Sequence, residues 1–377
     1  ILKNQEGYTT GKWRAGLQVW GQKGVVVSLM RRIVSGVYCG CSFADNVAVV
    51  APFDVANLLP IFAFCESGEL ERAVRAIDQK LNVPCNTLGK VPFDLTYWQR
   101  VANEKYPHGF PKPHSDDPTQ WLFNGDPSGA RHPLQVAVAR LASYRWPRQT
   151  GSSFTDCAAL GPDGLERHAA ADGSVCLTPL RGDPPAADRL ISLLGDAFGP
   201  EWSAAKLASL LAEAGFEGKT LDDWLRDGFF AQHCELFHQR PFIWHIWDGR
   251  REGFHALVNY HKLAGANGEG KRMLSTLIYT YLGDWIDRQR ADQKAGVEGA
   301  DARLAAAEQL KSELANILSG EPPYDLFVRW KPLAEQAIGW EPDVNDGVRM
   351  NIRPFMNAKP LGAKAKGVCI LRVTPKI

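Results

Sequence analysis

Three polar side chains at alternating positions near the C-terminal end carry the chemistry that this sequence displays most clearly. Arg349, Asn351 and Arg353 alternate with apolar residues, and an acidic, turn-forming run at 341–347 precedes them. Alternation with a period of two predicts a strand with one buried face, so the three polar side chains share the other face. Guanidinium forks and carboxamides bind phosphate oxygens and base edges. A solvated strand face, with arginines paired to the preceding aspartates, explains the same pattern.

Basic residues gather at both ends of the chain. The formal net charge is only +1, but Glu6 is the single acid before Tyr38, and no acid follows Asp346. Two basic ends that fold together predict one surface facing phosphates; alternatively, each end packs against an acidic neighbour. The candidate DNA-binding residues are Lys12, Arg14, Lys23, Arg31, Arg32, Arg329, Lys331, Arg349, Asn351 and Arg353.

Composition places the chain among globular proteins. It has 377 residues, 45% of them hydrophobic and 23% charged, which is enough for two or three domains. No apolar run reaches the ~18 residues that span a bilayer, so we expect no membrane partner. Eight cysteines without a C-x₂-C pair predict no structural zinc site and no disulfide framework. A reduced, cytoplasmic protein without a metal site is therefore expected.

Periodicity predicts an α+β fold. The β-rich start has strands expected at 24–30, 36–41 and 46–52, followed by helices at 53–65, 68–80, 94–104 and 133–143. The middle is largely helical, with helices at 187–198, 203–214, 221–237, 272–290 and 301–319, and strands at 240–247 and 256–262. From Tyr324 the chain is expected to return to strands.

These patterns divide the chain into four segments. Residues 1–147 form a mixed α/β region, which the family resemblance given below implies is part of a target-recognition domain, and 148–185 form a Gly/Pro-rich linker or insert. Residues 186–320 form a mainly helical accessory domain. Residues 321–377 form a short, basic, β-rich tail that is expected to pack on the N-terminal region.

Two other motifs have simpler interpretations. Residues 265–271 match the start of a phosphate-binding P-loop, but Arg272 replaces the hydroxyl residue that coordinates magnesium, which favours a flexible turn. Five histidines lie between His233 and His261 without the i, i+4 spacing of a zinc-binding helix. We interpret them as hydrogen-bonded structural residues.

Several long strings resemble one protein family. They are LNVPCNTLGKVPFDLTYWQRVANEKYP at 81–107, DDPTQWLFNG at 116–125, RPFIWHIWDGRREGFHALVNYHKL at 240–263, PYDLFVRWKPLAEQAIGW at 323–340 and DVNDGVRMNIRPF at 343–355. They look like the C-terminal half of the large bacterial adenine-specific DNA methyltransferases of BREX and DISARM phage-defence systems, which are similar in plan to type IIG restriction–modification proteins.

The resemblance implies a non-catalytic, target-recognition portion of an N6-adenine methyltransferase. The family's glycine-rich S-adenosylmethionine loop and Asn-Pro-Pro-Tyr motif, which holds a flipped adenine, are not found here. The nearest string is 321–324, where Glu321 replaces the asparagine and Asp325 follows the tyrosine. We therefore expect no catalytic residue in this segment, and no activity from it alone. The S-adenosylmethionine site is expected in a methyltransferase domain upstream.

The expected partners are duplex DNA, the upstream methyltransferase domain of the same polypeptide and other defence-system proteins. An alternative function is a protein-interaction scaffold within a defence complex. In that interpretation, Trp224 and Trp285 of the helical middle lie on the surface and dock other components.

Overall fold

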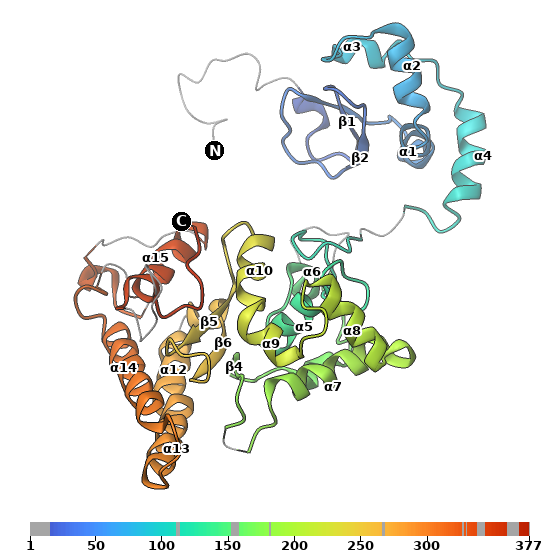
Figure 1. Cartoon of the computed structure of the whole chain (residues 1–377). Coiled ribbons are helices and arrows are strands. Elements are labelled where there is room, and N and C mark those ends of the chain that lie inside the picture. The colour runs from blue at the N-terminus through green and yellow to red at the C-terminus, as the bar shows by residue number, and fades with distance from the viewer. Residues whose placement is uncertain are drawn as a thin grey trace. The chain divides into compact units, whose positions relative to one another are not determined.

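The computed structural model describes most of the chain as two compact units, Ile1–Lys112 and Pro113–Ile377 (Figure 1). The described residues are 16–110, 114–151, 158–180, 182–265, 268–325, 328, 330–337, 344–359 and 369–376, with the side chains of 344–349 left out.

The first unit combines a small antiparallel sheet with helices. The strands are β1 (Gly24–Ser28), β2 (Ser35–Tyr38) and β3 (Val47–Val50), in the order β2-β1-β3. The helices are η3 (Leu17–Val19), η4 (Val55–Asn57), α1 (Leu58–Glu66), α2 (Glu69–Ile77), α3 (Cys85–Leu88) and α4 (Leu95–Lys105). The expected strands and helices of this region are therefore confirmed.

The core of the first unit follows from the sequence pattern. Val25 and Val27 alternate along β1 and are fully buried, while Leu70 and Val74 lie one turn apart on α2 and meet the same core. The hydroxyl of Ser67 accepts a hydrogen bond from the backbone N–H of Glu69 at 3.1 Å, which satisfies one free donor at the start of α2.

The second unit is built around a short antiparallel sheet in the order β4-β6-β5. Its strands are β4 (Ser174–Cys176), β5 (Ile243–Trp247) and β6 (His255–Asn259). Its first helices are α5 (Pro133–Leu141), α6 (Pro147–Thr150), η5 (Leu165–His168), α7 (Ala186–Phe198), η6 (Gly199–Glu201), α8 (Ala204–Glu213), α9 (Leu221–Asp227) and α10 (Phe229–Leu236). The later ones are α11 (Tyr260–Leu263), α12 (Glu269–Thr276), the π-helix η7 (Leu277–Tyr281), α13 (Leu282–Lys294), α14 (Ala300–Ser319), η8 (Leu333–Glu335) and α15 (Val344–Asn357).

Helices flank this sheet on two sides. Figure 1 shows α5 and α7–α10 on one side of β5 and β6, and α12–α14 on the other. Every residue of β5 and β6 is buried, as expected for strands that are covered on both faces. Gly320 ends α14 in the left-handed region at φ 65°, which is the C-cap expected from the sequence. The α+β class is confirmed.

The expectation for the C-terminal region is wrong. Residues 344–357 form the helix α15 rather than a strand, so Arg349, Asn351 and Arg353 do not share the face of a strand. Ile352 and Phe355 are buried, and the Phe355 ring lies 5.2 Å from that of Trp244. Ile352 and Phe355 are three residues apart, so a helix places both on the face that packs against β5. This helical packing outweighs the period-two alternation of residues 348–353, which had predicted a strand.

The described residues after α15 do not form the expected β-rich tail either. One antiparallel bridge joins Leu371 to Ile246, and the N–H of Trp247 donates to the carbonyl of Ile370 at 3.1 Å. Ile352, Phe355 and Leu371 belong to the same core as β5 and β6. The described part of 321–377 therefore packs within the second unit, against the sheet.

The boundary at 112/113 differs from the four expected segments. Residues 133–141, expected in the first segment, share one core with 186–198 and with 369–371. The expected linker at 148–185 contains the strand β4, which pairs with β6. In the described part of the chain, no helix is long and apolar enough to cross a bilayer.

Candidate nucleic-acid interface

The turn between β1 and β2 presents two arginines that the sequence singled out. Arg31 and Arg32 are exposed there, between the strands that end at Ser28 and begin at Ser35. Arg31 has φ 58°, in the left-handed region that non-glycine residues rarely occupy. A left-handed non-glycine residue costs free energy, so the surrounding structure must hold the turn in place.

Backbone pairing with the segment after α2 supplies that support. The N–H of Arg31 donates to the carbonyl of Leu81 at 2.8 Å, and the N–H of Val83 donates to the carbonyl of Leu29 at 2.9 Å. The guanidinium of Arg75 joins the two segments further, because it donates to the carbonyls of both Arg31 and Lys80. The turn and residues 80–83 therefore form one supported element.

The nearby carboxylates are engaged with backbone donors. Glu71 accepts the N–H of Ile33 at 3.1 Å, and Asp78 accepts the N–H of Lys80 at 2.9 Å. The side chains of Arg31, Arg32 and Lys80 make no hydrogen bond or ion pair with any residue that the structure describes. These three cations, named the turn cations below, are therefore available to an anionic partner.

The other predicted residues do not join this group. Lys23 is exposed one residue before β1. The Nζ of Lys331 donates to the carbonyl of Gly320 at 3.2 Å, which ties it to the end of α14. Asn351 lines a small cavity beside Tyr260 and Phe355, whereas Arg353 is exposed on α15.

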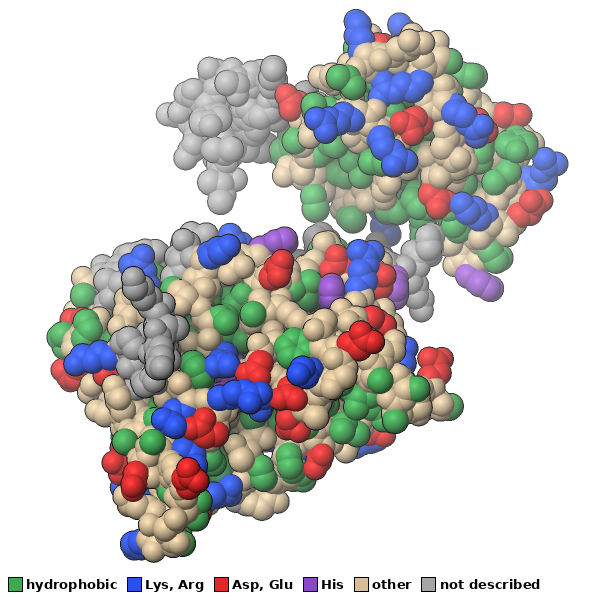
Figure 2. All heavy atoms as spheres, viewed as in Figure 1, with side chains coloured by type: hydrophobic (Ala, Val, Ile, Leu, Met, Phe, Trp, Pro, Cys, Tyr) green, Lys and Arg blue, Asp and Glu red, His purple; other side chains and the backbone are tan. Residues whose placement is uncertain are grey.

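Four predicted residues cannot be assigned a contact. Lys12, Arg14 and Arg329 lie outside the described residues, and so does the side chain of Arg349. Figure 2 shows Lys and Arg side chains interspersed with Asp and Glu on the visible faces of both units. The sequence analysis missed Lys80, whose approach to the turn depends on pairing between distant segments.

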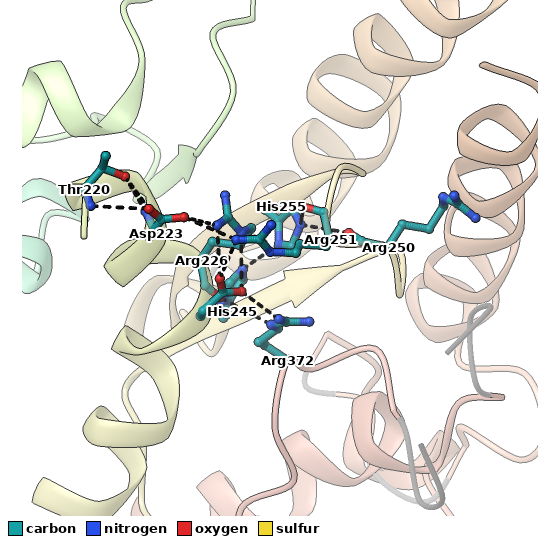
Figure 3. Close-up of polar contacts among 9 residues, drawn as sticks. Thr220, Asp223, Arg226, His245, Arg250, Arg251, His255 and Arg372 are labelled. Carbon is teal, nitrogen blue, oxygen red and sulfur yellow. Dashed lines mark hydrogen bonds and ion pairs between the residues drawn. The ribbon is translucent and has the colours of Figure 1, made fainter. Parts of the chain in front are cut away.

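A second group of arginines lies in the second unit and is neutralised there (Figure 3). Arg226 pairs with Asp223 and Asp227 of its own helix, and Arg251 lies 3.3 Å from each of the same carboxylates. Arg372 pairs with Asp227 at 2.8 Å, and its guanidinium carbon lies 4.0 Å from the centre of the Trp247 ring. This network, named the arginine–aspartate network below, attaches the C-terminal segment to α9.

Unlike the turn cations, the arginines of the arginine–aspartate network are already paired with carboxylates and are not available to phosphates. Hydrogen bonds from Thr220 and Arg226 to the carboxylate of Asp223 lower the pKa of Asp223 to about 2, so this carboxylate stays charged at neutral pH. A phosphate would have to displace two carboxylates from the arginines. We therefore assign the arginine–aspartate network a structural role.

Three of the histidines are buried and hydrogen-bonded, as their pattern suggested. His233 accepts the backbone N–H groups of Phe242 and Ile243 through Nε2 at 3.2 and 3.1 Å, just where β5 begins. His255 donates through Nε2 to the carbonyl of Arg250 at 2.9 Å, so its Nδ1 accepts a hydrogen bond from Nε2 of His245 at 3.0 Å. His255 is therefore neutral, and burial lowers the pKa of His245 well below its usual value, so His245 is neutral near pH 7 as well.

Burial explains their acid–base behaviour. It lowers the pKa of His233 to about 3 and, with Arg372 nearby, that of His255 to about 4. The Nδ1 of His245 has no hydrogen-bond partner among the described residues. No group of three His, Cys, Asp or Glu side chains in the described ranges is placed to hold a metal ion.

Two other sequence interpretations can be compared with the structure. Trp224 and Trp285 are buried, with 0% and 5% exposed, so the expectation that they form a docking surface is wrong. Tyr324 is also buried, and its hydroxyl donates to Glu313 at 2.7 Å. A tyrosine held in this way does not stack on a flipped adenine.

No protein-family model matches the chain, and a search of curated proteins gives no significant match.

Proposed function

We propose that this chain is the DNA-binding, target-recognition portion of an adenine-N6 DNA methyltransferase of phage defence or restriction–modification. The observation that carries the proposal is the group of turn cations, Arg31, Arg32 and Lys80, held on a supported turn without carboxylate partners. Guanidinium and ammonium groups in this state bind phosphates without first breaking an ion pair. The sequence resemblance supplies the class of enzyme.

The proposal divides the reaction between two parts of one polypeptide. This portion grips duplex DNA, and an upstream domain binds S-adenosylmethionine and transfers the methyl group. Other proteins of the defence system are further partners in this proposal. The chain alone is expected to bind DNA without methylating it.

Fluorescence anisotropy with a labelled duplex of random sequence tests the proposal. The wild-type chain is compared with Arg31→Gln/Arg32→Gln/Lys80→Gln and with the matched control Lys90→Gln/Lys271→Gln/Lys294→Gln. The control residues are exposed lysines outside the turn, so both variants lose the same charge. We expect the turn variant to lose at least about tenfold in affinity, and the control to lose much less. Equal losses in both would contradict the assignment to the turn.

A further inference from the structure

Exposed apolar side chains accompany the turn cations. Met30 precedes Arg31 and is 47% exposed, while Leu81 follows Lys80 and is 73% exposed. An antiparallel bridge pairs Met30 with Asn82, the residue after Leu81, and the N–H of Arg31 donates to the carbonyl of Leu81, so the two apolar residues lie on adjacent segments. The turn therefore presents two large apolar residues among three available cations.

The local structure keeps both apolar residues out of the core. The backbone of Met30 is fixed by a hydrogen bond from its N–H to the hydroxyl of Ser28 at 3.3 Å, in addition to the bridge. Leu81 is fixed through its carbonyl, which accepts the N–H of Arg31. Neither side chain belongs to the core cluster of the unit, and the backbone of both is held by hydrogen bonds, so their exposure belongs to a supported surface.

Charge identifies the partner that suits this surface. Arg31 follows Met30 in the chain and Lys80 precedes Leu81, with Arg32 next along the turn. The nearby carboxylates of Glu71 and Asp78 are bonded to backbone N–H groups. Proteins that bend duplex DNA place Met or Leu side chains between base steps in the minor groove and hold the flanking phosphates with basic residues. An apolar protein partner would gain nothing from three cations at the same place.

We infer that Met30 and Leu81 form a wedge that enters the minor groove and bends the duplex, while the turn cations hold the phosphates on either side. This inference rests on the proposed function and adds its mode of contact. Unstacking a base step costs free energy, and the cost is smaller where the base pair is already mismatched. The wedge therefore makes the chain prefer a duplex with a central mismatch.

A bending experiment on the whole chain tests the wedge. A duplex of about 30 base pairs, long enough for a measurable bend, carries one dye at each end, and energy transfer is read at saturating protein. The wild type is expected to raise the transfer efficiency and to bind the mismatched duplex roughly tenfold more tightly than the matched one. Met30→Ala/Leu81→Ala is expected to abolish both effects.

The control is Val55→Ala, which truncates another exposed apolar residue of the same unit, 65% exposed. It is expected to bend DNA like the wild type. Salt-sensitive binding without any bend, equal in wild type and Met30→Ala/Leu81→Ala, overturns the wedge but leaves the proposed function intact. Absence of binding to either duplex at low salt overturns the proposed function and the wedge together.

Discussion

Arg31 combines backbone strain with an available charge at one position. Its φ of 58° is unfavourable for a residue with a Cβ, and its guanidinium makes no hydrogen bond or ion pair with the described residues. Strained backbone conformations cluster at ligand-binding sites, where the surrounding structure holds them in place. Stability and binding are therefore expected to respond to this residue in opposite directions.

Replacing Arg31 with glycine tests this opposition. Arg31→Gly relieves the left-handed conformation, and we expect the free energy of unfolding to rise by about 1 kcal/mol. Removal of the guanidinium is expected to weaken duplex binding at the same time. Urea denaturation and anisotropy measure the two effects. A less stable variant with unchanged affinity would show that Arg31 serves the fold.

The buried histidines predict a loss of stability in acid. Their pKa values, about 3 for His233 and about 4 for His255, lie below the value of about 6.5 in an unfolded chain. Between these values the unfolded state binds more protons, so stability is complete above about pH 6.5 and falls as the pH drops toward 4. Asp248 has the opposite effect on stability. Burial raises its pKa to about 6, so the folded state binds this proton more tightly than the unfolded state and gains stability as the pH falls through 6.

Each histidine contributes a slope of up to about 1.4 kcal/mol per pH unit in this window. Urea denaturation of the wild type between pH 7.5 and 4.5, at roughly half-unit steps across the window, measures the combined slope. The buried histidines outnumber Asp248, so a net decrease is expected. Stability that stays constant or rises toward pH 4.5 would show that these side chains are accessible to protons in the folded protein.

At the scale of elements, α15 is held by its apolar side. Phe355 is 3% exposed and lies against Trp244, whereas Arg353 is exposed on the same helix. We expect Phe355→Ala to cost about 3–5 kcal/mol of unfolding free energy, because it leaves a cavity beside β5. Arg353→Ala is expected to change it by less than about 0.5 kcal/mol. Thermal and urea denaturation compare the two, and similar effects would mean that α15 does not dock as described.

Local patterns predicted most elements of the fold but misassigned α15. The helix α14 was predicted almost to the residue, because twenty residues of helical composition end at Gly320. In α15 the alternation around Arg349 covers only about six residues, and the helical spacing of Ile352, Phe355 and Met356 becomes visible only beyond Arg353. The strand β4 was missed because its three residues lie in a region rich in turn formers.

The candidate site was predictable only in part, for a similar reason. Arg31 and Arg32 follow an evident strand, so their place at a turn could be inferred from the sequence. Lys80 and Leu81 reach the turn through hydrogen bonds between segments about fifty residues apart, and local periodicity contains no information on such pairing. The link from Arg372 to Asp227 was missed because it joins residues even farther apart.

At the scale of the whole molecule, each unit has its own hydrophobic core. The first is formed by residues between Val25 and Ala102, and the second by residues between Phe123 and Leu371. Units with separate cores generally fold alone. We expect residues 1–112 and 113–377, produced separately, each to unfold cooperatively, and the first to retain most of the duplex affinity. Calorimetry and anisotropy test this, and an unfolded 1–112 fragment would contradict it.

The most direct test of the account is the salt dependence of duplex binding in the wild type and in Arg31→Gln/Arg32→Gln/Lys80→Gln. Each phosphate contact contributes about 0.9 to the slope of log affinity against log salt concentration. If the turn cations hold phosphates, the slope is expected to become shallower by about 2 to 3 in this variant and to stay unchanged in Lys90→Gln/Lys271→Gln/Lys294→Gln. Identical slopes for the wild type and both variants would contradict the account.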